Sequence, residues 1–240
     1  MRSKLFIGVL FALTLIGCAA PAETESAATA TGAESATAAT ESSAAEPAPA
    51  AETAVAKTEE AKPDSYYVDK VVELETDLGT ISIRFYPDVA PNHVRNFIDL
   101  AENGDYDGTK FHRIIPGFVI QGGDPNTRSG DPSTWGQGGS GSGVKAEFST
   151  VHHARGILSM ARSMDVDSAR SQFFICVDDA GALDNKYSVF GKVVSGMDVV
   201  DKIVAGKKGG PRGDQALEPV SIKKAAVRAA KDGEKGPAPK

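Results

Sequence analysis

The stretch YDGTKFHRIIPGFVIQGG, residues 106–123, decides how the rest of this 240-residue chain is interpreted. Two short apolar runs, 111–115 and 118–121, flank a Pro-Gly turn, which predicts two adjacent β-strands. Polar side chains interrupt these runs at His112, Arg113 and Gln121. A guanidinium held against apolar walls loses its hydration, which is costly unless the group binds something. Arg113 is therefore a candidate functional residue.

The chain on either side of this stretch has the pattern of a mainly β domain. Alternating residues at 72–76 and 81–85, with a turn between them, predict a β-hairpin. Apolar residues at helical spacing predict one helix after Pro91, ending near Gly104, and a second from about 196 to 205. Further strands are expected at 156–161, 173–177, 189–194 and around 220–222. The segment 122–145 is rich in Gly and Ser and is predicted to be a surface loop.

Composition excludes several classes of function. The formal net charge of −6 argues against a nucleic-acid-binding protein, which usually carries a basic face. The four His and two Cys are scattered along the chain, which leaves little material for a metal site. Cys176 lies in an apolar run and is predicted to be a small buried residue, so the fold is expected not to depend on a disulfide.

The N-terminal residues have the pattern of an export signal. Arg2 and Lys4 precede an apolar run at 5–16, which is too short to span a bilayer comfortably. The run ends in Leu-Ile-Gly-Cys at 15–18, which resembles the lipobox of bacterial lipoproteins, in which the cysteine is lipidated. This resemblance implies a signal peptide at 1–17 and lipidation of Cys18. The alternative is an ordinary secretory signal with a chance cysteine.

The remaining organisation follows from composition. Residues 18–65 consist almost wholly of Ala, Thr, Glu, Ser and Pro, and acidic residues far outnumber lysines. Such a segment cannot bury enough apolar surface to offset its chain entropy, so it is predicted to be a disordered tether. Residues 66–228 are predicted to form the globular domain and 229–240 a flexible tail.

Residues 106–123 do not stand alone. Together with GILSMA at 156–161, SQFFI at 171–175 and LDNKYSVFGKV at 183–193, they resemble the cyclophilin family of peptidyl-prolyl cis/trans isomerases over about 68–227. The resemblance implies an eight-stranded antiparallel barrel closed by two α-helices. It also implies acceleration of X–Pro bond rotation in Pro-containing polypeptides, with no cofactor and no metal.

The same resemblance assigns the site. The catalytic arginine of the family falls on Arg113. Substrate-binding positions fall on His112, Phe118, Val119, Gln121, Ala161, Arg162, Gln172, Phe174, Leu183 and Tyr187. Ala182 and Tyr187 depart from the best-known eukaryotic members, which carry Trp and His there, and Arg162 stands where Asn is common. These departures leave the substrate preference open.

Two hypotheses for function follow. The first is an isomerase that assists the folding of exported proteins, acting as a monomer anchored through Cys18 at the bacterial cell envelope and facing the periplasm. Ala19 after the lipidated cysteine favours the outer membrane. The second is a non-catalytic module that uses the same groove to hold Pro-containing segments. The presence of Arg113 favours the enzyme.

Overall fold

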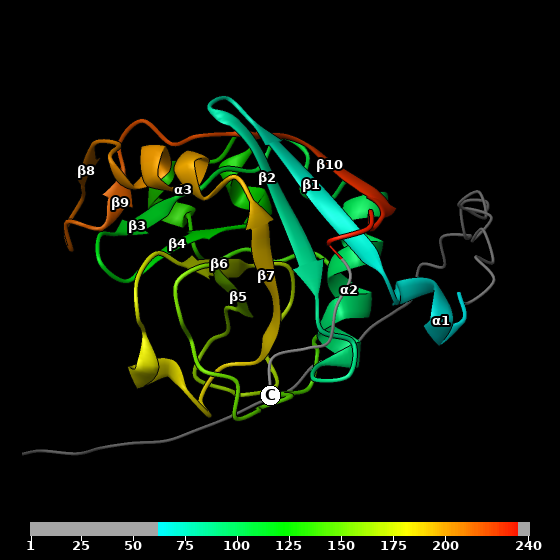
Figure 1. The fold of residues 1–240 in the computed structure, drawn as a ribbon. Coiled ribbons are helices and arrows are strands. Elements are labelled where there is room, and N and C mark those ends of the chain that lie inside the picture. Colours follow the sequence, from blue (N-terminus) through cyan, green and yellow to red (C-terminus); the bar gives the residue numbers. More distant parts are fainter. Residues whose placement is uncertain (1–61, 235–240) are drawn as a thin grey trace, which may run out of the picture. The chain divides into compact units, whose positions relative to one another are not determined.

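The computed structural model describes residues 62–234, which form one mainly β domain (Figure 1). Ten strands make a single antiparallel sheet in the order β10-β1-β2-β7-β5-β6-β4-β3-β9-β8. The strands are β1 Lys70–Thr76, β2 Gly79–Phe85, β3 Arg113–Ile115, β4 Val119–Gly122, β5 Ile157–Met160, β6 Phe173–Cys176, β7 Val189–Ser195, β8 Lys208–Gly209, β9 Gln215–Ala216 and β10 Ile222–Ala229. The helices are α1 Asp64–Tyr67, α2 Pro91–Glu102 and α3 Met197–Val204, and the 3₁₀ turns are η1 Pro125–Thr127, η2 Pro132–Thr134 and η3 Gly181–Leu183.

The predicted closed eight-stranded barrel is wrong in two respects. The sheet has ten strands. The two additional strands, β8 and β9, have two residues each and are too short to give an alternating pattern in the sequence. The sheet is also open, since β10 and β8 at its two ends do not pair. The predicted strand at 111–115 begins only at Arg113, so the chain before it meets β10 through an isolated bridge between Lys110 and Ser221 instead of a ladder.

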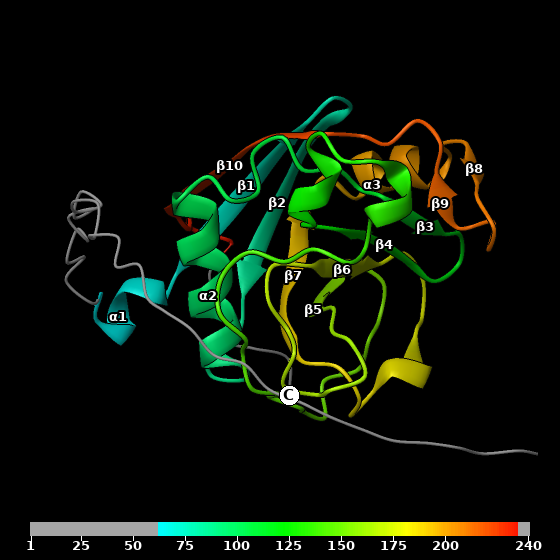
Figure 2. The same ribbon diagram turned by 180° about the vertical axis from the view of Figure 1, so that it is seen from behind.

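The hairpin and both main helices are confirmed. The pairing Thr76↔Gly79 leaves a two-residue turn between β1 and β2. Pro91 opens α2, where its missing N–H costs nothing. Helix α2 lies beside β10 and β7, while α3 lies against β2, β3 and β4, and both views show the two helices at different parts of the sheet (Figures 1 and 2).

Helix α2 has its N-terminus capped by a distant residue. Ala90 at the N-cap offers no side-chain hydrogen bond. The carboxylate of Glu147 instead accepts the backbone N–H groups of Asn92 and His93, and it also contacts His93 Nδ1 at 2.6 Å. Two of the unpaired donors at the helix end are thereby satisfied. The contact fixes the chain just after the Gly-rich segment against the helix.

Strand register separates a core face from a second face of the sheet. Ile114, Ile120, Ile175 and Leu158 are cross-strand neighbours on β3, β4, β6 and β5, and all belong to the main hydrophobic core. Because side chains alternate along a strand, the preceding or following residues point the other way. A second, smaller apolar cluster, which includes Phe174, lies under that other face.

Phe97 on α2 is the centre of the main core. Its ring is fully buried and contacts the rings of Phe85, Tyr106, Phe173 and Phe190 at centroid distances of 4.6 to 5.5 Å. These rings come from β2, β6, β7 and the loop after α2, so a single side chain joins the helix to distant parts of the sheet.

The described chain begins before the predicted domain boundary at residue 66. Lys62 forms ion pairs with Asp99 and Glu102 of α2, and Asp64 pairs with Arg95. Several predicted features lie outside the described residues. They are the signal peptide, Cys18, most of the tether and the last six residues of the tail. None of the helices within 62–234 is long and apolar enough to cross a bilayer.

We expect Phe97→Ala to lower the free energy of unfolding by about 3–5 kcal/mol, because it leaves a large cavity where four aromatic rings meet. Denaturant titration followed by circular dichroism measures this loss. Phe148→Ala is the matched control, since Phe148 is 43% exposed and its removal should change stability by well under about 1 kcal/mol. Equal effects of the two substitutions would contradict the assignment of Phe97 to the core.

Candidate active site

Strand register brings the candidate site residues into one row. Arg113 on β3 is directly opposite Gln121 on β4, and Gln121 is opposite Phe174 on β6. Cross-strand neighbours project to the same side of a sheet with their Cβ atoms about 4.5–5.5 Å apart. The row therefore places a cation, an amide and an aromatic ring side by side on the face opposite the main core.

The Arg113 guanidinium is held from one side. Its Nε donates to Asp214 Oδ2 at 2.7 Å, and its Nη1 donates to Gln121 Oε1 at 3.3 Å. Partial burial alone would raise the pKa of Asp214, but the hydrogen bond and charge of Arg113 hold that pKa below its ordinary value. Asp214 is therefore a carboxylate that fixes the arginine. No local sequence pattern indicates this contact, because the two residues are 101 positions apart.

A cavity of about 130 Å³ opens beside this guanidinium. It is lined by Arg113, Phe118, Val119, Gln121, Ala161, Arg162, Phe174, Leu183 and Tyr187. Every lining residue is among those assigned from the sequence. Two assigned residues, His112 and Gln172, do not line it. One small hollow, with apolar and aromatic side chains beside two guanidiniums, is thus assembled from β3, β4 and β6 and from the segments that follow β3, β5 and β6.

The aromatic wall of this cavity is packed in a defined geometry. The rings of Phe174 and Tyr187 meet edge to face at 5.5 Å, and the guanidinium of Arg162 lies 4.8 Å from the centroid of Tyr187. Arg162 also donates to the carbonyl of Lys186. These contacts tie the segment after η3 to the segment after β5 and keep the cavity open between them.

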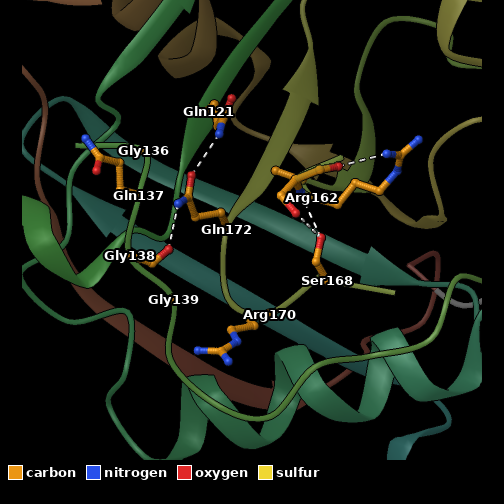
Figure 3. A pocket seen from close by; sticks show the side chains of 11 residues that line it. Gln121, Gly136, Gln137, Gly138, Gly139, Arg162, Ser168, Arg170 and Gln172 are labelled. Atoms are coloured by element: carbon orange, nitrogen blue, oxygen red, sulfur yellow. Dashed lines mark hydrogen bonds between the residues drawn. The ribbon is translucent and has the colours of Figure 1, made fainter. Parts of the chain in front are cut away.

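A chain of hydrogen bonds leads from the arginine to a second cavity, and Figure 3 shows its part from Gln121 to Gly138. Gln121 Nε2 donates to Gln172 Oε1 at 2.8 Å, and Gln172 Nε2 donates to the carbonyl of Gly138 at 2.7 Å. The second cavity measures about 340 Å³ and shares Gln121, Ala161 and Arg162 with the first. Its other lining residues are Gly136, Gln137, Gly138, Gly139, Ser163, Ser168, Arg170 and Gln172.

The Gly-rich loop that forms one side of this second cavity is organised by Asp124. This carboxylate is fully buried and accepts backbone N–H groups from Asn126, Gly136 and Gly138. A Cβ on Gly138 would lie 2.3 Å from Asp124 Oδ1, so only glycine fits at that position. The sequence predicts a surface loop here, but it does not reveal the carboxylate that fixes the shape of the loop.

His112 lies beneath this loop and away from the cavities. Its side chain is 4% exposed, and neither ring nitrogen has a hydrogen-bond partner among residues 62–234. Burial lowers its pKa, so the ring is neutral near pH 7. A Cβ on Gly136 would lie 3.7 Å from its Nε2. His112 therefore supports the loop from below, one residue before Arg113.

A His–Asp cluster that the sequence analysis did not single out anchors the remaining wall. Asp184, which directly follows Leu183, contacts His152 Nδ1 at 2.7 Å and His153 Nδ1 at 2.8 Å. His152 Nε2 also contacts Asp179 at 2.8 Å. Hydrogen bonds to Asp184 and Asp179 raise the pKa of His152 from 6.5 to about 8. The adjacent pair His152-His153 is the only sequence signal that pointed to the cluster.

Comparison with known proteins agrees with this geometry. Residues 71–227 match the sequence model of the family described as cyclophilin type peptidyl-prolyl cis-trans isomerase/CLD. A probable peptidyl-prolyl cis-trans isomerase of Brucella abortus is 44% identical over 167 residues, which are 67% of this chain and 84% of the relative. Peptidyl-prolyl cis-trans isomerase A of Dickeya dadantii is 42% identical over 164 residues, covering 65% of this chain and 83% of the relative.

A solved structure shows the same fold. The cyclophilin type peptidyl-prolyl cis-trans isomerase of Cryptosporidium parvum, crystallised in the presence of the dipeptide Ala-Pro, superposes with a TM-score of 0.58 at 28% identity. The match covers 66% of this chain and 99% of that chain.

The cluster around Asp184 predicts a pH-dependent contribution to stability. Because folding raises the pKa of His152, the contribution is complete below about pH 6.5 and is lost as pH rises through about 8. We expect His152→Gln to lower the melting temperature at about pH 6 and to have little effect above about pH 9. Differential scanning calorimetry across this range measures the difference, with Lys192→Gln as the control. A difference that does not vary with pH would contradict the role of the His152 proton.

Proposed function

The chain belongs to the cyclophilin-type peptidyl-prolyl cis-trans isomerase family, and we propose that Arg113 is the group through which it catalyses rotation about X–Pro bonds. The proline ring would occupy the cavity of about 130 Å³ between Phe118, Phe174 and Leu183. The observation that carries the proposal is the position of the Arg113 guanidinium at the rim of that cavity, held from behind by Asp214.

The reaction requires electrostatics and orientation, and no covalent bond breaks. Rotation about a peptide bond interrupts amide resonance at a cost of ~18–20 kcal/mol, and uncatalysed X–Pro bonds exchange over ~tens to hundreds of seconds. In the twisted state the prolyl nitrogen regains a lone pair, which can accept a hydrogen bond. A donor that contacts this lone pair stabilises the twisted state more than either planar state. An acceleration of 10⁴-fold corresponds to only ~5.5 kcal/mol.

The geometry of Arg113 fits this requirement. Asp214 and Gln121 occupy Nε and one Nη1 hydrogen, so the remaining N–H groups are without a partner among residues 62–234. The side chain is 33% exposed and can reach a substrate. Its orientation is set before substrate arrives, so little reorganisation is needed in the transition state.

The Ala-Pro dipeptide of the Cryptosporidium relative supports proline as the recognised residue in this chain. The second cavity adjoins the first through Gln121, Ala161 and Arg162, so a longer substrate would extend into it. Val119, Gln172 and Tyr187 complete the proposed substrate-binding set, and His112, which lines neither cavity, borders it from beneath the loop. We propose that the domain acts on Pro-containing polypeptides as a monomer and needs no cofactor.

We also propose a location. The charged, apolar and Leu-Ile-Gly-Cys segments of the N-terminus support lipidation of Cys18 after removal of residues 1–17. The Ala/Thr/Glu/Ser/Pro-rich segment that follows would serve as a spacer between the lipid and the domain. The isomerase would then act on exported proteins in the periplasm, with its anchor in the outer membrane.

We expect Arg113→Ala to lower kcat/KM for a short X–Pro peptide by about 10²–10³-fold, the range found for loss of one preorganised donor to a transition state. Arg113→Lys should recover only part of this loss, because an ammonium lacks the planar fork that contacts Asp214 and the substrate together. A protease-coupled isomerisation assay measures both variants, and circular dichroism checks their folding. A folded Arg113→Ala variant with wild-type activity would refute the catalytic assignment. A folded wild-type chain that binds the peptide without accelerating it would favour the non-catalytic binding module.

For the anchor, we expect Cys18→Ser to abolish incorporation of labelled fatty acid and to move the protein from the membrane to the soluble fraction of a Gram-negative host. Isomerase activity should not change, since the active site lies in residues 113–187. Continued membrane association without the label would indicate an uncleaved secretory signal as the anchor.

A further inference from the structure

The second cavity carries positive charge that no residue of the described chain neutralises. Arg162 and Arg170 both line it, and within residues 62–234 neither guanidinium forms an ion pair with a carboxylate. Arg162 donates only to backbone carbonyls, those of Ser163, Met164 and Lys186. The Arg170 side chain forms no hydrogen bond within residues 62–234, and Figure 3 shows its guanidinium with no dashed line to the other residues drawn.

Arg113, at the smaller cavity, differs from Arg162 and Arg170 because it is paired with a carboxylate. Arg113 pairs with Asp214 at 2.7 Å, so its charge is balanced by a carboxylate of the chain itself. Two carboxylates are close to the second cavity in sequence, but neither lines it. Asp165 accepts the N–H of Asp167 in its own loop, and Asp167 accepts the N–H of Ala146, which joins that loop to the segment after the Gly-rich loop. No carboxylate of residues 62–234 lines this cavity, so a negatively charged group of a ligand could pair with its arginines.

Arg162 is held in place before any ligand arrives, whereas in Arg170, an exposed residue, only the aliphatic stem is packed. The aliphatic stem of Arg170 packs over Gly139, where an added Cβ would lie 3.0 Å from Arg170 Cδ. Arg162 is fixed by the carbonyl of Lys186 and by the ring of Tyr187. A charged group that is already oriented loses less side-chain entropy when it binds an anion. Partial enclosure by the Gly-rich loop also strengthens the attraction relative to an open surface.

We propose that Arg170, with Arg162, gives this isomerase a preference for polypeptides that carry Glu or Asp within three residues of the isomerising proline. The inference rests on the proposed function, because it requires the proline to sit in the neighbouring cavity. The two cavities share Gln121, Ala161 and Arg162, so a short extended peptide with proline in one would place a nearby side chain in the other. Glu and Asp are favoured because a carboxylate accepts two parallel N–H groups of a guanidinium.

The test uses the full-length chain and peptide pairs that differ only in charge. Each pair contains one X–Pro bond and carries either Glu or Gln at a single position, one to three residues before or after the proline. We expect the Glu peptide to be isomerised with a kcat/KM about three- to tenfold higher than the Gln peptide at the favoured position, since partly exposed charge pairs contribute modestly. The ratio should fall towards one at about 1 M salt, where the Debye length is only ~3 Å.

Two substitutions locate the effect. With Arg170→Gln, we expect the Glu/Gln ratio to fall towards one. With Arg170→Glu, we expect the Glu/Gln ratio to fall below one. A matched peptide with Lys at the same position should then be a better substrate than the Gln peptide. Lys224→Gln removes the same charge from an exposed position on β10 that lines neither cavity, and it should leave the ratio at its wild-type value. Thermal unfolding of each variant checks that the fold is retained.

The outcomes separate this inference from the proposed function. If the wild-type chain accelerates the Glu and Gln peptides equally at every position, the acidic preference is refuted and the isomerase assignment stands. If Lys224→Gln reduces the ratio as much as Arg170→Gln, the preference reflects net charge and the cavity is not its source. If the wild-type chain accelerates none of the peptides, the proposed function fails first and the inference fails with it.

Discussion

The pairing of β3, β4 and β6 determines which side chains meet at the site. Arg113, Gln121 and Phe174 are directly opposite one another in the ladder. A shift of one residue in any of these strands would turn its site side chain into the main core and expose an isoleucine in its place. The isoleucines that pack on the core face therefore hold the row of Arg113, Gln121 and Phe174 in register, and the stability of the core and the geometry of the site have a common origin.

Three carboxylates then fix the parts of the site that the sheet does not position. Asp214 holds Arg113, Asp124 holds the Gly-rich loop, and Asp184 holds the segment that carries Leu183. In each case the partner is a cation, a set of backbone N–H groups or a histidine, so the carboxylate is compensated for its loss of hydration. Loops that would otherwise move freely thereby become walls of the two cavities.

Local patterns predicted local structure well and long-range contacts poorly. The hairpin around 77–78 and helix α2 follow from alternation, helical spacing and a proline, all of which are read within a few residues. The sheet is open because β8 and β10 do not pair, and no periodic pattern in the sequence reveals whether two distant strands pair. The lining of the smaller cavity was assigned through family resemblance. Asp214 and Arg170 were missed because a polar residue in a loop has the same appearance in sequence whether it contacts a site or only solvent.

The hydrogen-bonded chain from Arg113 through Gln121 and Gln172 to Gly138 has a single possible direction. An arginine can only donate at one end, and a backbone carbonyl can only accept at the other. Each glutamine between them could in principle present its oxygen or its nitrogen either way, but the two ends remove that freedom. The two cavities are therefore joined by a polar connection whose sense is the same in every molecule. Under the proposed function, a substrate that spans both cavities would meet donors and acceptors whose positions are already determined.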